Sequence, residues 1–417
     1  MPHSPSPRSR ADAIGFAEFV ALIALLMGLT ALAIDIMLVA LPDITRTYGI
    51  AEPNQRQLVV TSYLIGFAAG QPFYGPLSDR FGRKPMLVVG LLIFALGALG
   101  AAIAPSFEWL LAARALQGVG TAAPRVIAIA VVRDRFAGRG MAEVMSFVMM
   151  VFIIIPIIAP LVGEGIVKVG TWPWIFGFMF LAAAAALVWL VLRLPETRPK
   201  EDRIALSGRA LASAFRQVAT NRQASGYTIA LGFMFGGLMS YIGSAQQIFV
   251  DVYGLGTLFP IVFGGIAAAM ALASLTNARL VGRIGMRRVS HVALIGYVAA
   301  GVVLASLGFP QQPPLWVLIV FLVVEFYCFG LIAPNFNALA MEPLGHVAGM
   351  ASSFIGFYTT AAGAFLGWAT GQAFDGTVRP LTVGFTVFGI LALAVVLKTE
   401  GGRLMRTGER PKVQSAE

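Results

Sequence analysis

Four ionisable side chains stand inside long apolar stretches of the sequence: Asp35, Arg114, Arg125 and Glu325. Ionisable groups are costly at membrane depth, so each is a candidate functional residue. A carboxylic acid removed from water favours its neutral form, and a nearby cation or substrate restores the ionised form. An acid that alternates between these two settings takes up a proton on one side of a membrane and releases it on the other. That is the chemistry that proton coupling requires.

Asp35 and Arg114 are expected at similar depth near the outer side of the membrane, because the first apolar run ends there and the fourth begins there. Opposite charges at one depth predict a cross-helix pair. The pair is either a static ion pair that joins two helices, or a proton- and substrate-binding acid with its basic partner.

Arg125 follows Arg114 by nearly three helical turns, about 16 Å along the same helix face. A helix with two arginines on one stripe is expected to face water or protein and not lipid. Glu325 lies in the middle of the apolar run 314–334. We expect it to be either a second proton carrier or a partner for Arg125, and in both cases to face inward.

The composition sets the class of protein. The chain has 417 residues, of which 58% are hydrophobic and only 12% charged, whereas a soluble protein carries about a quarter charged residues. The net charge of +10 does not indicate nucleic-acid binding, because the cations collect in short loops between apolar segments. Cys328 is the lone cysteine, so no intrachain disulfide is possible. No metal-binding, cofactor-binding or hydrolytic motif is visible, and an enzyme is not expected.

Twelve apolar segments are long enough to cross a bilayer. They lie near 17–40, 57–78, 86–104, 108–133, 141–165, 174–194, 226–249, 257–281, 289–308, 314–334, 346–371 and 379–398. The segments predict an all-α membrane protein with two pseudo-symmetric six-helix bundles. The predicted parts are an N-terminal tail (1–16), a first bundle (17–194), a central loop (195–225), a second bundle (226–398) and a C-terminal tail (399–417). Lys and Arg concentrate in the loops on the same side as both termini, which predicts that this side is cytoplasmic.

A compact charged loop joins the second and third segments. It runs Gly75-Pro76-Leu77-Ser78-Asp79-Arg80-Phe81-Gly82-Arg83-Lys84-Pro85. Its second-half counterpart, Leu280-Val281-Gly282-Arg283-Ile284-Gly285-Met286-Arg287, keeps Leu, Arg, Gly and a final cation, but Gly282 replaces Asp79. This internal repeat predicts two parallel halves with a site between them, which is a transporter architecture.

The single acid in this repeat suggests a single charge latch. We hypothesise that Asp79 docks on the free amides at the start of the eleventh segment, residues 345–353, when the cytoplasmic side is closed. Asp79→Asn should then favour an inward-open state.

The fifth segment contains Pro156, Pro160 and Gly163. Prolines four residues apart remove backbone donors from one helix face, and a glycine permits close packing. The pattern indicates either an ordinary kinked helix or a motif with a role in transport.

The charged loop resembles the signature of the major facilitator superfamily, G-x-L-x-D-R-x-G-R-[KR], in which Gly75, Asp79, Arg80, Gly82, Arg83 and Lys84 match. The fifth-segment pattern resembles the superfamily's antiporter motif, although Glu164 stands where a glycine commonly follows. Further blocks are similar to the bicyclomycin/chloramphenicol-resistance branch of the drug:proton antiporters. They are Asp35 with Leu41-Pro42, Gly70 to Arg80, Arg114 to Gly120, Val132-Arg133-Asp134, Ala333-Pro334-Asn335 and Ala348 to Ser352.

The resemblance implies proton-driven export of small, moderately lipophilic compounds across the bacterial inner membrane, with protons as coupling ions and no other cofactor. It implies that Asp35 is the proton and substrate acid, that Arg114 is its partner, and that Asp79 and Arg83 form an inner gate with Arg133 as a basic residue near it. Candidate cavity residues are Tyr63, Phe67, Phe235, Tyr241, Tyr327, Phe357 and Tyr358.

Two other functions fit the same sequence. The nearer one is a sugar or organic-acid transporter of the same fold, and the other is a non-transporting sensor or scaffold, which the gate and proton-site residues disfavour. The expected partners are a small-molecule substrate and the lipid bilayer, and we expect a monomer.

Overall fold

The computed structural model describes residues 14–136, 138–203, 208–308 and 312–405, apart from the side chains at 138, 139, 142, 146, 149, 151–153, 210 and 346. The regular elements of these residues are all helical. The first half contains α1 (Phe16–Asp35), η1 (Leu38–Ala40), α2 (Leu41–Thr47), η2 (Pro53–Gln57), α3 (Leu58–Phe81), α4 (Arg83–Ala102), α5 (Phe107–Arg135), α6 (Gly138–Val169), α7 (Pro173–Arg193) and η3 (Lys200–Asp202). The second half contains α8 (Gly208–Thr220), α9 (Arg222–Gln246), η4 (Gln247–Val252), η5 (Gly256–Leu258), α10 (Phe259–Ile284), α11 (Met286–Ser306), α12 (Leu315–Met341), η6 (Glu342–Val347), α13 (Ala348–Gln372) and α14 (Arg379–Thr399).

The long helices coincide with the twelve predicted segments. Among the described residues, 9 helical stretches are long and apolar enough to cross a membrane. The helices α3, α6 and α13 complete the set with 24, 32 and 25 residues. The predicted all-α membrane fold is confirmed. Most of both predicted tails, 1–16 and 399–417, lies outside the described residues.

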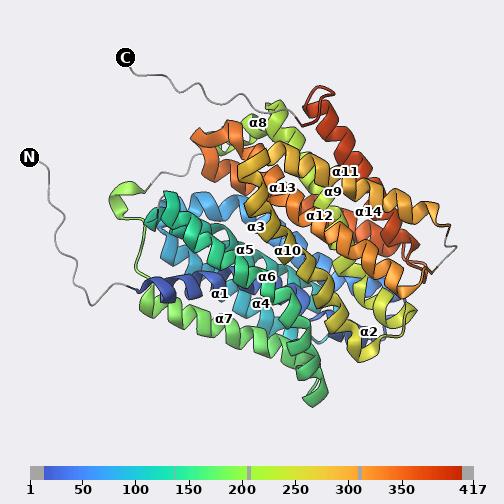
Figure 1. The fold of residues 1–417 in the computed structure, drawn as a ribbon. Helices are drawn as coiled ribbons and strands as arrows, with labels where there is room; N and C mark the ends of the chain where they lie inside the picture. The colour runs from blue at the N-terminus through green and yellow to red at the C-terminus, as the bar shows by residue number, and fades with distance from the viewer. Residues whose placement is uncertain (1–13, 137, 204–207, 309–311, 406–417) are drawn as a thin grey trace, which may run out of the picture. The chain divides into compact units, whose positions relative to one another are not determined.

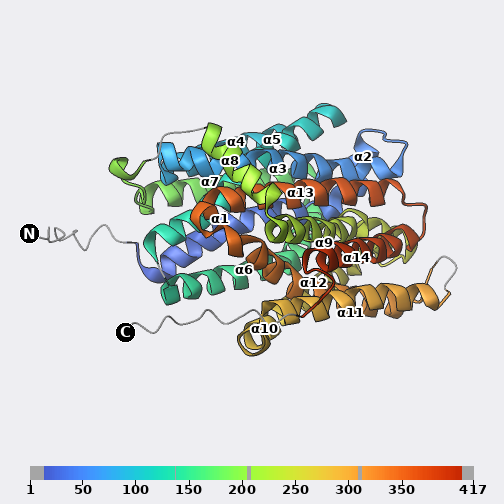
Figure 2. The same ribbon diagram turned by 90° about the horizontal axis from the view of Figure 1, so that it is seen from above.

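The chain forms two compact units, Met1–Gly208 and Arg209–Glu417. The boundary between them along the chain falls within the central stretch 195–225. Each unit is built of long helices (Figures 1 and 2), and these helices pair in the same order inside each unit. In the first unit α5 packs against α3 and α4, α1 against α6, and α4 against α7. In the second unit α12 packs against α10 and α11, α9 against α13, and α11 against α14. The structure therefore repeats the architecture that the loop motif repeats in sequence.

One glycine makes the sharp corner between consecutive long helices in each unit. Gly82 separates α3 from α4 with φ = 103°, and Gly285 separates α10 from α11 with φ = 84°. These values lie in the left-handed region, which a residue with a Cβ adopts only at a cost. The repeated glycines of the two loops thus have the same backbone function.

The first predicted segment, 17–40, is not one continuous helix. The helix α1 ends at Asp35, and a short turn and η1 lead into α2. Pro42 explains the interruption, because its ring would clash with the carbonyl of Leu38 in a continuous helix and its nitrogen has no hydrogen to donate. The candidate proton acid therefore stands at a helix end inside the first unit.

The central stretch 195–225 is not only a polar loop, because it includes the amphipathic helix α8. Its apolar face buries Ala214 and Val218, and the ring of Phe215 contacts that of Phe354 in α13 with centroids 5.3 Å apart. The sequence prediction missed this helix because its short apolar stripe lies among many charged residues.

Candidate functional site

Asp35 is almost completely buried, with 4% of its surface exposed. It ends α1, and the amide of the next residue, Ile36, still donates to the carbonyl of Leu32 at 3.1 Å. No ion pair within 4 Å joins this carboxyl group to a described cation. A buried carboxyl group without a neutralising cation is a group that favours binding a proton.

Arg114 is fully buried in α5, yet its guanidinium is well satisfied. Its Nε donates to the carbonyl of Val59 at 3.2 Å and a terminal nitrogen donates to the carbonyl of Ala33 at 3.0 Å. The second terminal nitrogen donates to the side chain of Gln117. The guanidinium also lies over the ring of Tyr63, 4.5 Å from its centroid. One cation thus joins three helices, α1, α3 and α5.

The predicted ion pair between Asp35 and Arg114 is not formed in this structure. Arg114 reaches α1 through the carbonyl of Ala33, which a continuous helix would bond to the amide of residue 37. The break after Asp35 leaves this carbonyl available. The arginine therefore holds the broken end of α1 while its charge remains unpaired by the nearby acid.

Tyr63 and Phe67, two of the predicted cavity residues, belong to the same buried region. The hydroxyl of Tyr63 donates to the carbonyl of Thr30 at 3.2 Å, and its ring stacks on Phe67 with centroids 6.3 Å apart. Tyr63 thus fixes α3 against α1 one turn before Asp35, which is a positioning role inside the first unit.

The motif of the fifth predicted segment meets the break in α1. A Cβ on Gly163 would overlap the carbonyl oxygen of Ile36 and lie 3.0 Å from Val39. Glycine therefore lets α6 approach the backbone that directly follows Asp35. Pro160 and Pro156 lie about one and two turns before Gly163 within α6. Glu164 does not loosen this packing, because it forms an ion pair with Lys168 at 3.3 Å instead.

Arg83 is the centre of a charge cluster at the basic end of the first unit, the end where α3 meets α4. It is 1% exposed. Its guanidinium lies 2.8 Å from Asp79 and 2.9 Å from Asp134 of α5, and it donates to the hydroxyl of Ser78 at 2.6 Å. Two acids therefore share one buried cation, and the cluster fastens the α3–α4 corner to the end of α5.

Glu196 adds the end of α7 to this cluster. Its carboxylate accepts the backbone amides of Arg83 at 2.9 Å and Lys84 at 3.2 Å, the first two residues of α4. A negative charge at a helix N-terminus satisfies free amides and interacts favourably with the helix dipole. Arg198, two residues on, lies 3.4 Å from Asp79.

The other cations of the loop motif have different surroundings. Arg80 is exposed and lies beside the ring of Phe81, 5.5 Å from its centroid. Lys84 donates from Nζ to the carbonyl of Val191 at 2.8 Å. Arg133, a predicted gate residue, is exposed, whereas its neighbour Asp134 makes the contact with Arg83.

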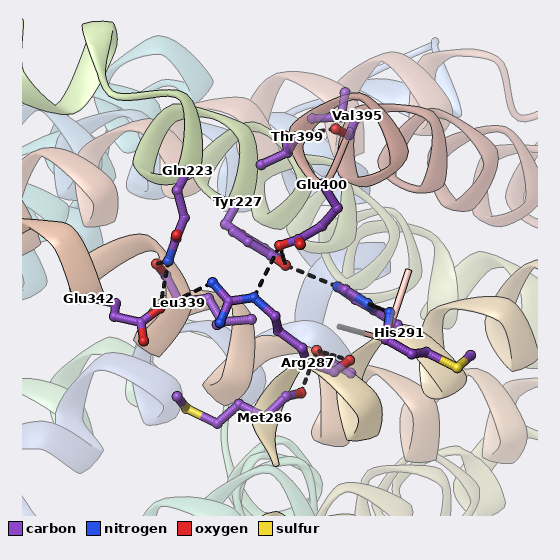
Figure 3. Close-up of polar contacts among 12 residues, drawn as sticks. Gln223, Tyr227, Met286, Arg287, His291, Leu339, Glu342, Val395, Thr399 and Glu400 are labelled. Atoms are coloured by element: carbon purple, nitrogen blue, oxygen red, sulfur yellow. Dashed lines mark hydrogen bonds and ion pairs between the residues drawn. The ribbon is translucent and has the colours of Figure 1, made fainter. Parts of the chain in front are cut away.

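The second unit has a charge cluster at its own basic end, the end where α10 meets α11 (Figure 3). Arg287 lies 3.2 Å from Glu342, which follows α12, and 3.2 Å from Glu400, which follows α14. The expectation of a single latch is therefore wrong. The loop lost its acid at Gly282, but acids from two other helix ends neutralise the cation instead.

Buried His291 extends this second cluster. Its Nε2 lies 3.0 Å from the hydroxyl of Tyr227, and that hydroxyl donates to Glu400 at 2.7 Å (Figure 3). Its Nδ1 accepts the backbone amide of Met405 at 3.0 Å. Met405 has φ = 63°, which is unusual for a residue other than glycine. The histidine thus holds the segment after α14 in a strained conformation.

The remaining candidates lie in different parts of the two units. Arg125 is half-buried in α5, and Glu325 is fully buried in α12. Tyr241 packs against Phe263 and Phe326, with centroids 5.3 and 4.7 Å away, so it belongs to the apolar core of the second unit. The others from the second half are partly exposed: Phe235, Tyr327, Phe357 and Tyr358. Their role as cavity residues stays a prediction, and so does the docking of Asp79 on residues 345–353.

Sequence reasoning assigned no individual role to several residues of these clusters. They are Ser78, Gln117, Asp134, Glu196, Glu342 and Glu400. Glu196 and Glu400 carried a usable signal, because each follows the last long helix of its unit within three residues. An acid that recurs at the end of both halves indicates a shared structural function.

Comparison with known proteins agrees with this architecture. The chain matches the Major Facilitator Superfamily over residues 23–367. It is 31% identical over 369 residues to the uncharacterised MFS-type transporter YdgK of Bacillus subtilis, covering 88% of this chain and 90% of the relative. It is 31% identical over 386 residues to the bicyclomycin resistance protein homolog of Haemophilus influenzae, covering 91% and 94%. A crystal structure of a D-xylose–proton symporter aligns with a TM-score of 0.72 at 15% identity, covering 94% of this chain and 99% of that one.

The family match and the named relatives identify a multi-pass membrane transporter and not an enzyme. The chain belongs to the major facilitator superfamily, and the branch predicted from its motifs, that of the bicyclomycin and chloramphenicol resistance proteins, is confirmed by its relatives. The likeness to the sugar symporter shows a common fold only.

Proposed function

We propose that this chain exports small lipophilic compounds by proton antiport, with Asp35 as the exchanging acid. The observation that carries the proposal is the arrangement at the end of α1. A buried carboxyl group without a cationic partner lies two residues after the carbonyl that the buried Arg114 holds. The name of the Haemophilus relative, a bicyclomycin resistance protein homolog, supports an organic antibiotic or a compound like it as cargo.

Asp35 and its surroundings can exchange a proton for cargo by a simple electrostatic rule. While Asp35 is neutral, the buried region tolerates it without a partner. Loss of the proton creates a buried negative charge, which a cationic or hydrogen-bond-donating cargo can stabilise. Proton and cargo therefore compete for one group, and the competition couples their movements in opposite directions.

Arg114 acts in this scheme as a positioning residue. Its hydrogen bonds to Val59 and Ala33 keep the broken end of α1 against α3 and α5. Gly163 lets α6 close on the same break from another side. The acid is thus placed by three helices of one unit, and a change in their packing would change its access to water.

The basic ends of the two units are, in this proposal, the cytoplasmic ends, because Lys and Arg concentrate on the side of both termini. Their charge clusters are then the inner gate. We further propose that the protein resides in the bacterial inner membrane with both termini inside, and that it works as a monomer.

Everted membrane vesicles test the proposal. Vesicles that contain the chain should accumulate a fluorescent lipophilic cation such as ethidium when respiration acidifies their lumen, and a protonophore should abolish the accumulation. Asp35→Asn should lose proton-driven transport. Asp43→Asn is the matched control, because Asp43 is an acid of the neighbouring α2 that pairs with Arg46 at the surface. Equal transport by wild type and Asp35→Asn would show that Asp35 does not couple transport to protons.

A further inference from the structure

Glu325 is a fully buried acid that the exchange at Asp35 does not use. It lies in α12 of the second unit and is 0% exposed. Neither of its carboxyl oxygens has a hydrogen-bond partner among the described residues. An ionised carboxylate in such a place would cost far more free energy than the fold can supply. These surroundings therefore favour the neutral carboxyl group over the carboxylate.

The neighbours of Glu325 along α12 show which helices it faces. Phe321, one turn earlier, contacts Phe385 of α14 with centroids 5.9 Å apart. Cys328, almost one turn later, lies against α11, because a Cβ on Gly296 would be 3.5 Å from its sulfur. Residues at i−4 and i+3 share a helix face with residue i. Glu325 therefore projects toward α11 and α14 inside its own unit.

Tyr297 of α11 is the polar group that this face meets. It is 1% exposed, and its hydroxyl has no hydrogen-bond partner among the described residues. Its ring stacks on the same Phe385 that Phe321 contacts, with centroids 5.8 Å apart. A Cβ on Gly237 would stand 2.5 Å from its hydroxyl, so α9 closes the other side. Two unpartnered polar groups thus share one apolar enclosure.

The charged and titratable groups around this enclosure are few. Tyr297 and Cys328 lie within electrostatic range of Glu325. The described residues of α9 and α14 that pack here contribute aromatic and small side chains, including Phe385 and Gly237. No described cation neutralises the acid, so its charge depends on its own proton and on the one hydroxyl that can donate to it.

We propose that Glu325 is a second proton-binding site, enclosed within the second unit, and that the Tyr297 hydroxyl is its hydrogen-bond donor when the proton leaves. The inference deepens the proposed antiport by adding a proton site that is separate from the cargo site. Deprotonation converts a neutral acid into an anion, which a rotation of the Tyr297 O–H would stabilise. The ligand is the proton itself, because an enclosed carboxyl group leaves no room for cargo.

Infrared difference spectroscopy of the purified full chain tests this site without any transport measurement. A protonated carboxylic acid has a C=O stretch that disappears on ionisation, so a pH titration should show such bands for the two buried acids, Asp35 and Glu325. Glu325→Gln should remove one of these bands, which is the Glu325 band. Tyr297→Phe keeps the ring and its stacking but removes the donor that would stabilise the anion, so the band should keep its frequency and persist to higher pH.

The control variant and the opposing outcomes are equally specific. Asp35→Asn should leave the Glu325 band in place, so failure of the proposed exchange at Asp35 would not touch this result. Thermal unfolding of each variant checks that it is folded. If Glu325→Gln removes no carboxylic acid band, Glu325 is ionised and the proposal is wrong. If the band is removed but no pH between about 5 and 10, the interval between the ordinary pKa of a glutamic acid and that of a tyrosine, titrates it in the wild type, Glu325 is a permanently neutral core group and the proposal is equally wrong.

Discussion

Gly163 of α6 lies directly against the carbonyl oxygen of Ile36, the first residue after α1 ends at Asp35. Gly163 and the backbone that follows Asp35 belong to different helices and are far apart in the sequence, yet they are in contact. The contact fixes how closely α6 approaches the break that carries the candidate proton acid.

Gly163→Ala should therefore impair transport far more than its size suggests. The added Cβ overlaps a backbone oxygen, which cannot move aside as a flexible side chain could, so α6 or the break must shift. Efflux should fall at least tenfold, which corresponds to a rise of about 1.4 kcal/mol in the activation free energy of transport. Gly165→Ala is the control, because a Cβ there meets nothing within 4 Å. Equal efflux by both variants would contradict the role of the contact.

Arg83→Ala should strongly destabilise the first unit. The substitution leaves Asp79 and Asp134 without the buried cation that they share, and breaking a buried pair in this way costs about 3–5 kcal/mol. Thermal unfolding in detergent measures the loss. Arg80→Ala, in the same loop, removes an exposed cation and should change stability by less than about 0.5 kcal/mol. A similar loss for both variants would mean that loop charge, and not the cluster, matters.

Gly82→Ala should cost more stability than Gly285→Ala. Both glycines have positive φ, so each alanine carries a backbone strain of about 1–2 kcal/mol. Only the Cβ at Gly82 also meets side chains, those of Glu196 and Arg203, whereas the position at Gly285 is open. The difference between the two melting temperatures thus reports on the cap that Glu196 places on α4, together with the neighbouring Arg203. Identical melting temperatures would show that this cap contributes nothing measurable.

The segment after α14 should open when the pH falls. The Nδ1 atom of His291 accepts the Met405 amide, which requires an unprotonated nitrogen. Protonation turns that nitrogen into a donor, so the contact is present at neutral and alkaline pH and lost in acid. Hydrogen–deuterium exchange of a peptide ending at Met405, corrected for the intrinsic rate, should show this loss of protection.

His291→Phe provides the comparison for that experiment. The ring is retained but the acceptor is gone, so the Met405 amide should exchange rapidly at every pH. Persistent protection in this variant, or protection in the wild type that does not change with pH, would contradict a tether made by the imidazole.

Sequence alone determined the class of protein, the positions of the long helices and the family. Twelve apolar runs of bilayer length permit only helices, because backbone groups in lipid must be satisfied within their own segment. The loop from Gly75 to Lys84 identified the superfamily, since its glycines and charges are set by a local turn between two helices. These properties depend on neighbours in the chain, and a sequence displays them directly.

Only the tertiary structure decided which groups meet. Asp35 and Arg114 were expected to form an ion pair, but a proline seven residues after Asp35 breaks the helix and gives the arginine a carbonyl instead. The cation Arg287 has no acid in its own loop, yet Glu342 and Glu400 neutralise it from two other helix ends. Such contacts join residues tens to hundreds of positions apart, and their geometry is set by how helices pack, which no local pattern encodes.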